Sequence, residues 1–258
     1  MITGTYPFGE PLRSVVQQDR SPKRVFVLGV YASAVHALWV GPDGKLLIQA
    51  VAVASEPVIF WDGADAEAIV GRIKLPAGAG KLIAANAGLN GPSGRALDEL
   101  FLRPLGCSRA DAWLCDLVPH TCLNAAQGKA LARSYTPRMA SLGLPAVDLP
   151  PVPREFADRA RREEVLAELR ESGAQTVVLL GDEPIKHWLT HFDGRWKSLA
   201  AFGDTKDTYG RRHEVTLDGL RVEVLPLVHP RQAAGLGAHS PGWRARHDAW
   251  RANAPSGM

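Results

Sequence analysis

The chain has 258 residues, of which 46% are hydrophobic and 22% charged, and its formal net charge is +3. This length suits one large domain, or a domain with a small insertion, and the composition is that of a globular protein with a sizeable core. No apolar run approaches the roughly 20 residues that span a bilayer, and residues 1–18 lack the features of a secretory signal. The three cysteines fit no zinc or disulfide spacing, so we expect a cytoplasmic protein without a metal and without membrane association.

In the first half of the chain, the sequence pattern indicates short strands that follow a polar arm over residues 1–23. Residues 31–40 are apolar and Ala-rich, and we expect a loop there that opens into a helix. Residues 93–102 have the apolar spacing of a helix. Short apolar runs predict strands over residues 24–29, 46–54, 81–85 and 112–118.

The second half of the chain alternates helices with strands after a loop-rich stretch over residues 121–153. Asp218-Gly219 stands between two β-rich runs and predicts a hairpin. The pattern indicates helices over residues 154–171, 184–190 and 243–251, and strands over residues 176–181, 213–217 and 220–228. The alternation favours an α/β fold: a single three-layer α/β/α domain with a central, mainly parallel sheet.

Ligands of such sheets bind at the carboxyl ends of the strands. In this chain the expected ends are Gly29, Asp116, Gly181 and His229. Past the last of them, residues 231–251 are basic and contain two tryptophans. Such a stretch indicates either phosphate contacts or the solvated face of a C-terminal helix.

Motifs at these strand ends resemble those of one enzyme superfamily. Val25-Phe-Val-Leu-Gly29 resembles the strand and glycine that open the first motif of uracil-DNA glycosylases, and Val228-His229-Pro230 resembles their second motif. Between them, Gly94-Arg95-Ala-Leu-Asp98-Glu-Leu and Ala112-Trp-Leu-Cys-Asp116-Leu-Val118 are similar to the pattern of the iron–sulfur branch. The resemblance covers residues 24–250, and it implies an N-terminal arm over 1–23 followed by a uracil-DNA glycosylase-like domain over 24–258.

The resemblance does not extend to the cofactor of the iron–sulfur branch. That branch holds its cluster with four cysteines, whereas this chain has only Cys107, Cys115 and Cys122, none of them in the N-terminal arm. We therefore expect no cofactor.

The resemblance implies roles for two residues. His229 takes the place of the family's second-motif histidine, and it would donate a hydrogen bond to a carbonyl oxygen of the departing base. Asp116 stands where the family has an Asn that reads the base edge. An ionised Asp only accepts hydrogen bonds, whereas a buried Asp with a raised pKa also donates. The alternative for Asp116 is a cap on the following loop, with His120 as a partner.

The first motif departs from the family pattern because Gly29 is followed by Val-Tyr-Ala-Ser, without a carboxylate or amide to activate water. Tyr31 would then form a pocket wall and Ser33 would offer a polar group, although simple packing explains Tyr31 equally well. Some branches of the superfamily take an acid from the loop before the next helix. In this chain that loop contains Asn90, which is our candidate for orienting the water.

In the family, the loop after the second motif enters the minor groove and fills the gap that the flipped base leaves. Leu236, between two glycines, is the candidate wedge, and the alternative is a loop residue that packs onto the core. Arg231, Arg244 and Arg246 are candidates for phosphate contacts.

Three functions remain open on the sequence. The first is a DNA glycosylase that recognises a flipped or free base and hydrolyses its N-glycosidic bond. The second is an inactive member that binds nucleic acid or a nucleotide, because the first motif lacks its water-activating residue. The third is a hydrolase of a small nucleoside-like substrate. We expect DNA or a nucleobase-containing small molecule as the partner, and a monomer.

Overall fold

A computed structural model describes residues 4–236 and 240–253. Its contacts divide the chain into two compact units. We call the first, Val16–Tyr31, Ser93–Pro119 and Glu155–Met258, the parallel-sheet unit. We call the second, Met1–Val15, Ala32–Pro92 and His120–Arg154, the antiparallel-sheet unit, which therefore includes the described part of the expected arm up to Val15.

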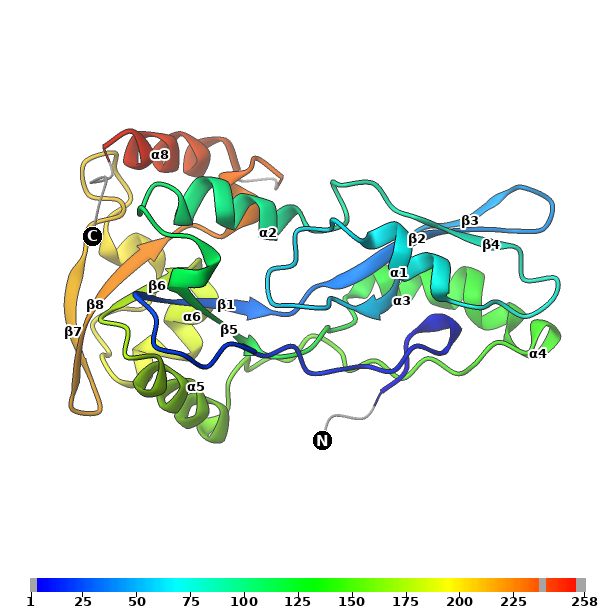
Figure 1. Ribbon diagram of the computed structural model, residues 1–258, viewed down its shortest axis with the longest axis horizontal. Helices are drawn as coiled ribbons and strands as arrows, with labels where there is room; N and C mark the ends of the chain where they lie inside the picture. Colours follow the sequence, from blue (N-terminus) through cyan, green and yellow to red (C-terminus); the bar gives the residue numbers. More distant parts are fainter. Residues whose placement is uncertain (1–3, 237–239, 254–258) are drawn as a thin grey trace. The chain divides into compact units, whose positions relative to one another are not determined.

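The parallel-sheet unit is built on a five-stranded sheet with the order β5-β1-β6-β8-β7 (Figure 1). Strands β5, β1, β6 and β8 are parallel, and β7 is an antiparallel edge strand. The α/β class with a mainly parallel sheet, expected from the alternation of strands and helices, is therefore confirmed. The strands are β1 (Val25–Tyr31), β5 (Ala112–Val118), β6 (Thr176–Leu180), β7 (His213–Leu217) and β8 (Leu220–Leu227).

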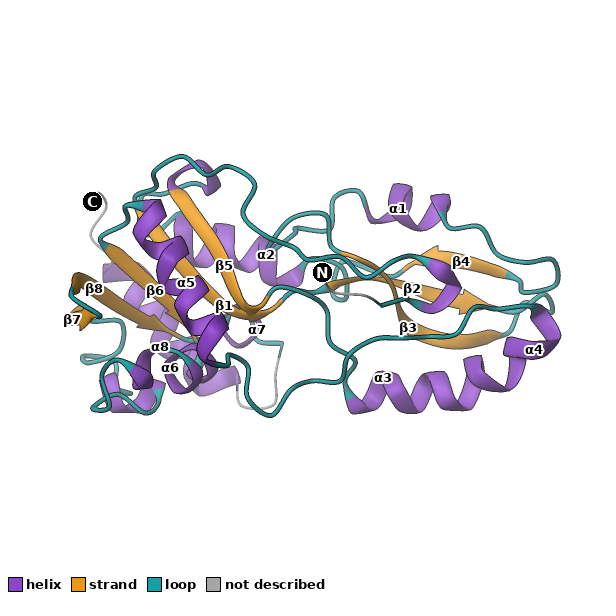
Figure 2. Cartoon of the chain, turned by 90° about the horizontal axis from the view of Figure 1, so that it is seen from below, coloured by secondary structure: helices purple, strands orange, loops and turns teal. Residues whose placement is uncertain are grey.

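Helices cover both faces of this sheet, as Figures 1 and 2 show. One face carries α5 (Arg159–Ser172) and α6 (Asp182–His187), and the other carries α2 (Pro92–Ala96) and α8 (Ser240–Asn253). The unit thus has the three layers that the sequence predicts. Its other helical segments are a π-helix over Leu97–Leu102, α7 (Pro230–Ala233), and 3-10 turns over Arg109–Asp111, Leu189–His191 and Leu199–Phe202.

Side chains of Gln17 and Arg161 form hydrogen bonds with the backbone of β5. Leu114 N donates to Gln17 Oε1 (3.1 Å), while Arg161 on α5 donates from Nε to Leu117 O (3.1 Å) and from Nη2 to Asp116 O (2.8 Å). Buried backbone groups need such partners because an unsatisfied one is costly. The guanidinium thereby fixes the end of β5, where Asp116 lies.

The hairpin expected at Asp218-Gly219 joins β7 to β8. Both turn residues have positive φ, 47° and 81°, and they connect the paired residues Leu217 and Leu220. A two-residue turn of this kind matches the twist of antiparallel strands and favours Asp-Gly. The sequence signal is confirmed.

The antiparallel-sheet unit contains a three-stranded sheet with the order β3-β2-β4. Its strands are β2 (Ala34–Val40), β3 (Leu46–Ser55) and β4 (Lys81–Ala84). The expectation of a loop and helix over residues 31–40 was wrong. Buried and partly buried side chains alternate from Val35 to Val40, which is the period of a strand, and the alanines between them conceal that pattern.

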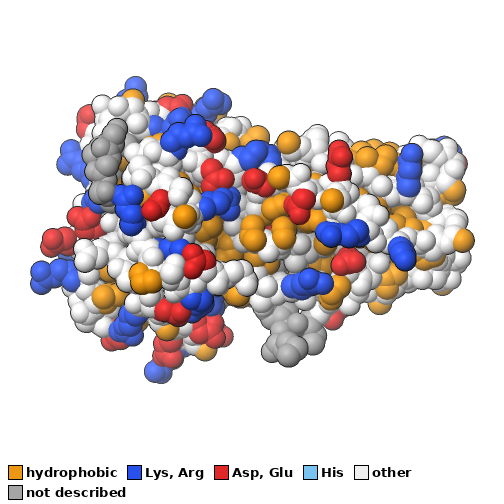
Figure 3. Space-filling model, viewed as in Figure 1, with side chains coloured by type: hydrophobic (Ala, Val, Ile, Leu, Met, Phe, Trp, Pro, Cys, Tyr) orange, Lys and Arg blue, Asp and Glu red, His pale blue; other side chains and the backbone are white. Residues whose placement is uncertain are grey.

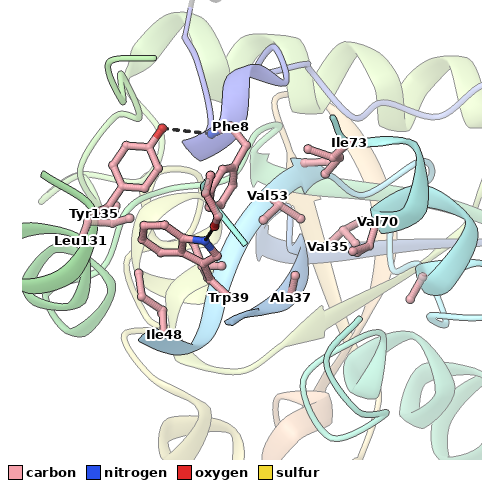
Figure 4. Packing of buried hydrophobic residues seen from close by; sticks show 14 of the residues in the cluster. Phe8, Val35, Ala37, Trp39, Ile48, Val53, Val70, Ile73, Leu131 and Tyr135 are labelled. Carbon is pink, nitrogen blue, oxygen red and sulfur yellow. Dashed lines mark hydrogen bonds between the residues drawn. The ribbon is translucent and has the colours of Figure 1, made fainter. Parts of the chain in front are cut away.

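Aromatic packing forms the core of this unit (Figure 4). Phe8 packs edge-on against both Trp39 and Tyr135, with ring centroids 5.3 Å apart in each pair. Tyr135 Oη accepts from Phe8 N (3.1 Å) and donates to Pro145 O (2.9 Å), and Trp39 Nε1 donates to Ala79 O (2.7 Å). The buried hydroxyl and indole groups therefore keep partners within the core.

Helical segments surround this core, including one stretch that the sequence does not predict. Residues 121–153 were expected to be loop-rich, yet Asn124 forms a capping box with Gln127 and begins a helical run. The segments are a 3-10 turn over Pro7–Gly9, α1 (Ala66–Arg72), α3 (Ala125–Ala130), a π-helix over Leu131–Tyr135, a 3-10 turn over Thr136–Arg138 and α4 (Met139–Leu142).

Candidate functional site

The carboxyl edge of the parallel sheet collects four of the residues singled out by the sequence. Because β5, β1, β6 and β8 are neighbours and run the same way, their ends lie along one edge. Gly29 and Asp116 are register partners, so no side chain stands beside Asp116 on β1. Both lie two residues inside their strands, because β1 continues to Tyr31 and β5 to Val118. The ends predicted for these two strands were therefore two residues too early in the sequence.

Gly181 and His229 meet at this edge. Gly181 has φ of +90°, and its N–H donates to Leu227 O (2.7 Å). A Cβ at position 181 would lie 3.3 Å from His229 Cβ. A residue with a side chain would be strained here by both its φ and the close approach, so glycine allows α6 to start against the His229 backbone.

The surroundings of His229 favour a neutral ring. Its Nδ1 accepts a hydrogen bond from Arg231 N (3.2 Å) and thereby caps α7. Burial lowers the pKa of His229 to about 4, and the charge of Arg231 acts in the same direction. The ring is therefore neutral at pH 7, with its proton on Nε2. Among residues 4–236 and 240–253 no hydrogen-bond partner is found for Nε2–H, which is the group that could donate to a ligand.

Asp116 is a buried acid with a strongly shifted titration. Burial raises the pKa of its carboxyl to about 7, while the positive charge of Arg161 opposes the shift. That guanidinium contacts the Asp116 carbonyl oxygen, and among the described residues no donor reaches the Asp116 carboxylate. Near neutral pH the group is a mixture of a protonated form, which donates and accepts, and an ionised form, which only accepts.

A row of three packed rings begins at Tyr31, the last residue of β1. Tyr31, 37% exposed, is stacked on Phe156 with centroids 6.3 Å apart and planes at 4°, and Phe156 packs edge-on against His187 at 5.1 Å. His187 Nε2 lies 3.1 Å from Glu183 Oε2. Phe156, His187 and Glu183 were not among the predicted site residues. Glu183 and His187 lie on α6, just after Gly181, and this position past a strand end was the available signal.

Ser33, Asn90 and His120 belong to the antiparallel-sheet unit, whereas His229 and Asp116 belong to the other. Ser33 N donates to the buried Glu56 (3.0 Å), and Ser33 O accepts from Thr121 Oγ1 (2.6 Å). Asp116 and His120 are thus in different units, and His120 Nδ1 lies 3.1 Å from Thr121 O.

The Asn90 amide has a structural role that differs from the one predicted. Its Oδ1 accepts from His36 N (2.8 Å), and its Nδ2 donates to His36 O (3.0 Å) and Ala85 O (2.9 Å). The side chain thereby extends the pairing of β2, and both of its donor hydrogens are used by backbone carbonyls. The amide therefore has no donor hydrogen left for a water.

The candidate DNA-contacting residues follow His229. Arg231 is exposed and Leu236 is 43% exposed, so the apolar side chain of Leu236 faces solvent rather than the core. On α8, Arg244 lies 3.8 Å from Asp248, and the Arg246 guanidinium lies 4.9 Å above the Trp243 ring. The intervening residues 237–239 lie outside the described part of the chain. On the face in Figure 3, acidic and basic side chains are interspersed over the parallel-sheet unit.

The cysteines are free thiols. Cys107, Cys115 and Cys122 are all buried, and burial raises the pKa of each thiol. In residues 4–236 and 240–253, no three His, Cys, Asp or Glu side chains come together as a metal site. Within the same ranges, no helix combines the length and the apolar character needed to cross a membrane.

Comparisons with known proteins leave the family undetermined. The sequence matches no protein-family model and none of the curated proteins with which it was compared. The geometry of the carboxyl edge and the resemblance of its motifs are what point to a function.

Proposed function

We propose that the parallel-sheet unit binds a nucleobase at the carboxyl edge of its sheet and hydrolyses the N-glycosidic bond of that base in DNA. The observation that carries this proposal is His229, a neutral histidine just past the end of β8: its Nδ1 accepts from Arg231 N, and within the described part of the chain its Nε2–H has no partner. The motif resemblance around Gly29, Asp116 and His229 supports it.

The chemistry that His229 would perform is stabilisation of a leaving group. As the bond between sugar and base breaks, negative charge develops on a carbonyl oxygen of the base. A preorganised donor directed at such an oxygen contributes about 10²–10³-fold to the rate. The low pKa of His229 keeps the ring neutral. A neutral imidazole N–H is a very weak acid, so it would stabilise the departing anion by a hydrogen bond and keep its proton.

Asp116 would read the edge of the base. In its protonated form the carboxyl presents one donor and one acceptor, as an Asn does, and therefore complements an edge that offers both a carbonyl and an N–H. In its ionised form it complements an amino-bearing edge. Tyr31, stacked on Phe156 and still partly exposed, would form an aromatic wall of the pocket.

Duplex contacts would come from the segment after His229. The exposed Leu236 is proposed as the wedge, and Arg231, Arg244 and Arg246 as phosphate contacts. Asp248 lies near Arg244, so the positive charge on this part of α8 is reduced.

A second function is favoured by one observation. Between Gly29 and Ser33 there is no carboxylate or amide to activate water, and the Asn90 amide donates to backbone carbonyls. This composition suits a protein that binds a nucleobase or nucleotide at the same edge without hydrolysing it.

Both functions are tested on one set of substrates. The full-length protein is incubated with single- and double-stranded oligonucleotides that carry uracil, hypoxanthine, xanthine or a mismatch, followed by alkaline strand cleavage. Free nucleosides form a separate arm. Abasic product that disappears with His229→Ala supports the glycosylase. Binding without product supports the second function, cleavage of nucleosides alone indicates a small-molecule hydrolase, and no binding in any arm refutes the proposal.

A further inference from the structure

A buried chain of hydrogen bonds ends at the residue before His229. Val228 N lies 2.9 Å from Tyr209 Oη, Tyr209 Oη lies 2.8 Å from His247 Nδ1, and His247 Nε2 lies 2.9 Å from Leu100 O. Tyr209 is 4% exposed and His247 is fully buried. All four residues belong to the parallel-sheet unit, and His247 is on α8.

The direction of every bond in the chain follows from its two ends. Leu100 O can only accept, so the proton of the neutral His247 ring must be on Nε2. Nδ1 then accepts, and the Tyr209 hydroxyl donates to it. The hydroxyl oxygen still has lone pairs and accepts from Val228 N. Each group in the chain is satisfied in one arrangement only.

This hydrogen-bond chain reaches the backbone at the point where the pairing between β6 and β8 has ended, just before His229. The last pair between β6 and β8 joins Leu180 to Leu227, and Leu227 O accepts from Gly181 N. Val228 and His229 lie past this ladder. The Tyr209 hydroxyl therefore replaces a neighbouring strand as the partner of the Val228 N–H.

Ring packing also holds Tyr209 and His247 in place, the first against α8 and the second within it. The His247 ring lies 4.4 Å from Phe101 and 5.0 Å from Trp250, and Tyr209 lies 6.1 Å from Trp243. Gly210, with φ of +70°, approaches Trp250 so closely that a Cβ would lie 2.4 Å from its ring. Burial lowers the pKa of His247 to about 4 and raises that of Tyr209, so both groups keep the protonation that the chain requires.

We propose that Tyr209 and His247 are a positioning pair for His229: they anchor the Val228–His229 backbone to α8 and thereby aim Nε2–H of His229 at the ligand. The catalytic consequence rests on the proposed function, whereas the effect on the geometry of His229 does not. Neither side chain contacts the substrate in this account, and both act through the backbone of Val228 and His229, just past β8.

The test compares two tyrosines with equal bonding. Tyr209→Phe removes a buried hydroxyl that accepts from a backbone N–H and donates to a second group, and so does Tyr135→Phe in the core of the antiparallel-sheet unit (Figure 4). The first readout is the ¹⁵N NMR spectrum of the imidazoles, with His229 assigned from the His229→Ala spectrum and followed through its pH titration. The second is kcat and KM on any oligonucleotide that the wild type cleaves.

We expect both variants to melt at lower temperature, and Tyr209→Phe alone to shift the His229 resonances and its titration. We also expect Tyr209→Phe alone to lower kcat by about tenfold to a hundredfold with KM within about twofold, because small misplacements of a catalytic group are costly. Unchanged His229 resonances in Tyr209→Phe, or equal shifts in both variants, would overturn the inference. A wild type without activity contradicts the proposed function only, since the NMR comparison still decides the positioning.

A second pair of variants, at His247, tests the inference even if Tyr209→Phe does not fold. His247→Gln keeps an amide donor for Leu100 O and an amide oxygen for Tyr209, whereas His247→Leu has neither. We expect the His229 resonances in His247→Gln to be closer to those of the wild type than in His247→Leu. Equal displacement of these resonances in both variants contradicts a hydrogen-bonded positioning role and leaves packing as the function of His247.

Discussion

Replacing Asp116 with Asn removes a buried acid and changes the pH dependence of stability. Asp116 is 4% exposed, and burial raises its pKa from 3.8 to about 7. Well below pH 3.8 the carboxyl is protonated in both the folded and the unfolded chain, so its burial does not lower the free energy of unfolding through ionisation. Between pH 4 and 7 the unfolded chain ionises while the folded chain keeps its proton, so stability falls as the pH rises. Above pH 7 the penalty levels off.

The size of this penalty follows from the shift. About three pKa units at about 1.4 kcal/mol each correspond to about 4 kcal/mol at pH 8 and above. Asp116→Asn has no such loss, so its advantage over the wild type should grow from pH 4 to pH 8. For a protein of this size that corresponds to roughly 10 °C in melting temperature. The assay is thermal unfolding of both proteins in matched buffers, with Asp204→Asn as the control for an exposed carboxylate.

A difference in melting temperature that stays constant from pH 4 to pH 8 would refute the burial argument for Asp116. If the assignment of this residue to base reading is also correct, the wild type should change its preference among bases between pH 6 and pH 8. Asp116→Asn should show one preference throughout, because an amide does not titrate in this range. An unaltered preference in Asp116→Asn would remove that role.

Three further predictions concern the edge of the sheet and helix α8. His229→Ala should lower glycosylase kcat by about 10²–10³-fold while the protein stays folded. The control is His191→Ala, which changes an exposed histidine of the same unit and should leave kcat unchanged. Equal loss in both variants would argue against a catalytic role of His229. Gly181→Ala should lower the free energy of unfolding by about 1–3 kcal/mol, because its backbone (φ 90°, ψ −169°) lies in a region that is open almost only to glycine, and it should also reduce activity. Denaturant titration and kinetics measure both effects, and an unperturbed Gly181→Ala would contradict the close approach to His229. Arg244→Ala and Arg246→Ala should each reduce the slope of log affinity against log salt by about one in DNA-binding titrations, and an unchanged slope would exclude them as phosphate contacts.

The parallel-sheet unit was predictable because its signals are local. Buried strands such as Thr176–Leu180 are short continuous apolar runs, and Asp218-Gly219 is a specific hairpin turn. In the antiparallel-sheet unit the strands expected over residues 46–54 and 81–85 are present as β3 and β4, whereas β2 was not predicted. The alanines of β2 conceal its alternation, and the strand is held by its pairing with β3 and β4 and by the Asn90 amide, which are contacts between residues distant in the sequence.

The candidate site was predictable only in part for the same reason. The order of strand ends brings Asp116 and His229 to one edge, and the sequence indicates both residues. Their protonation states depend on burial and on Arg231 N and Arg161, which the sequence does not place. The roles of Tyr209 and His247 were likewise hidden, since their partners Val228 and Leu100 are backbone groups distant in the chain.

The central claim is that a nucleobase binds at the carboxyl edge, against Nε2–H of His229 and the carboxyl of Asp116. Titration of free nucleobases into protein labelled with ¹⁵N-histidine and ¹³C-aspartate measures both contacts at once and does not require catalysis. Our account predicts that one class of base moves the His229 Nε2 and Asp116 carboxyl resonances together, with one saturation curve. Resonances that stay fixed for every base, at concentrations that saturate binding elsewhere on the protein, would contradict it.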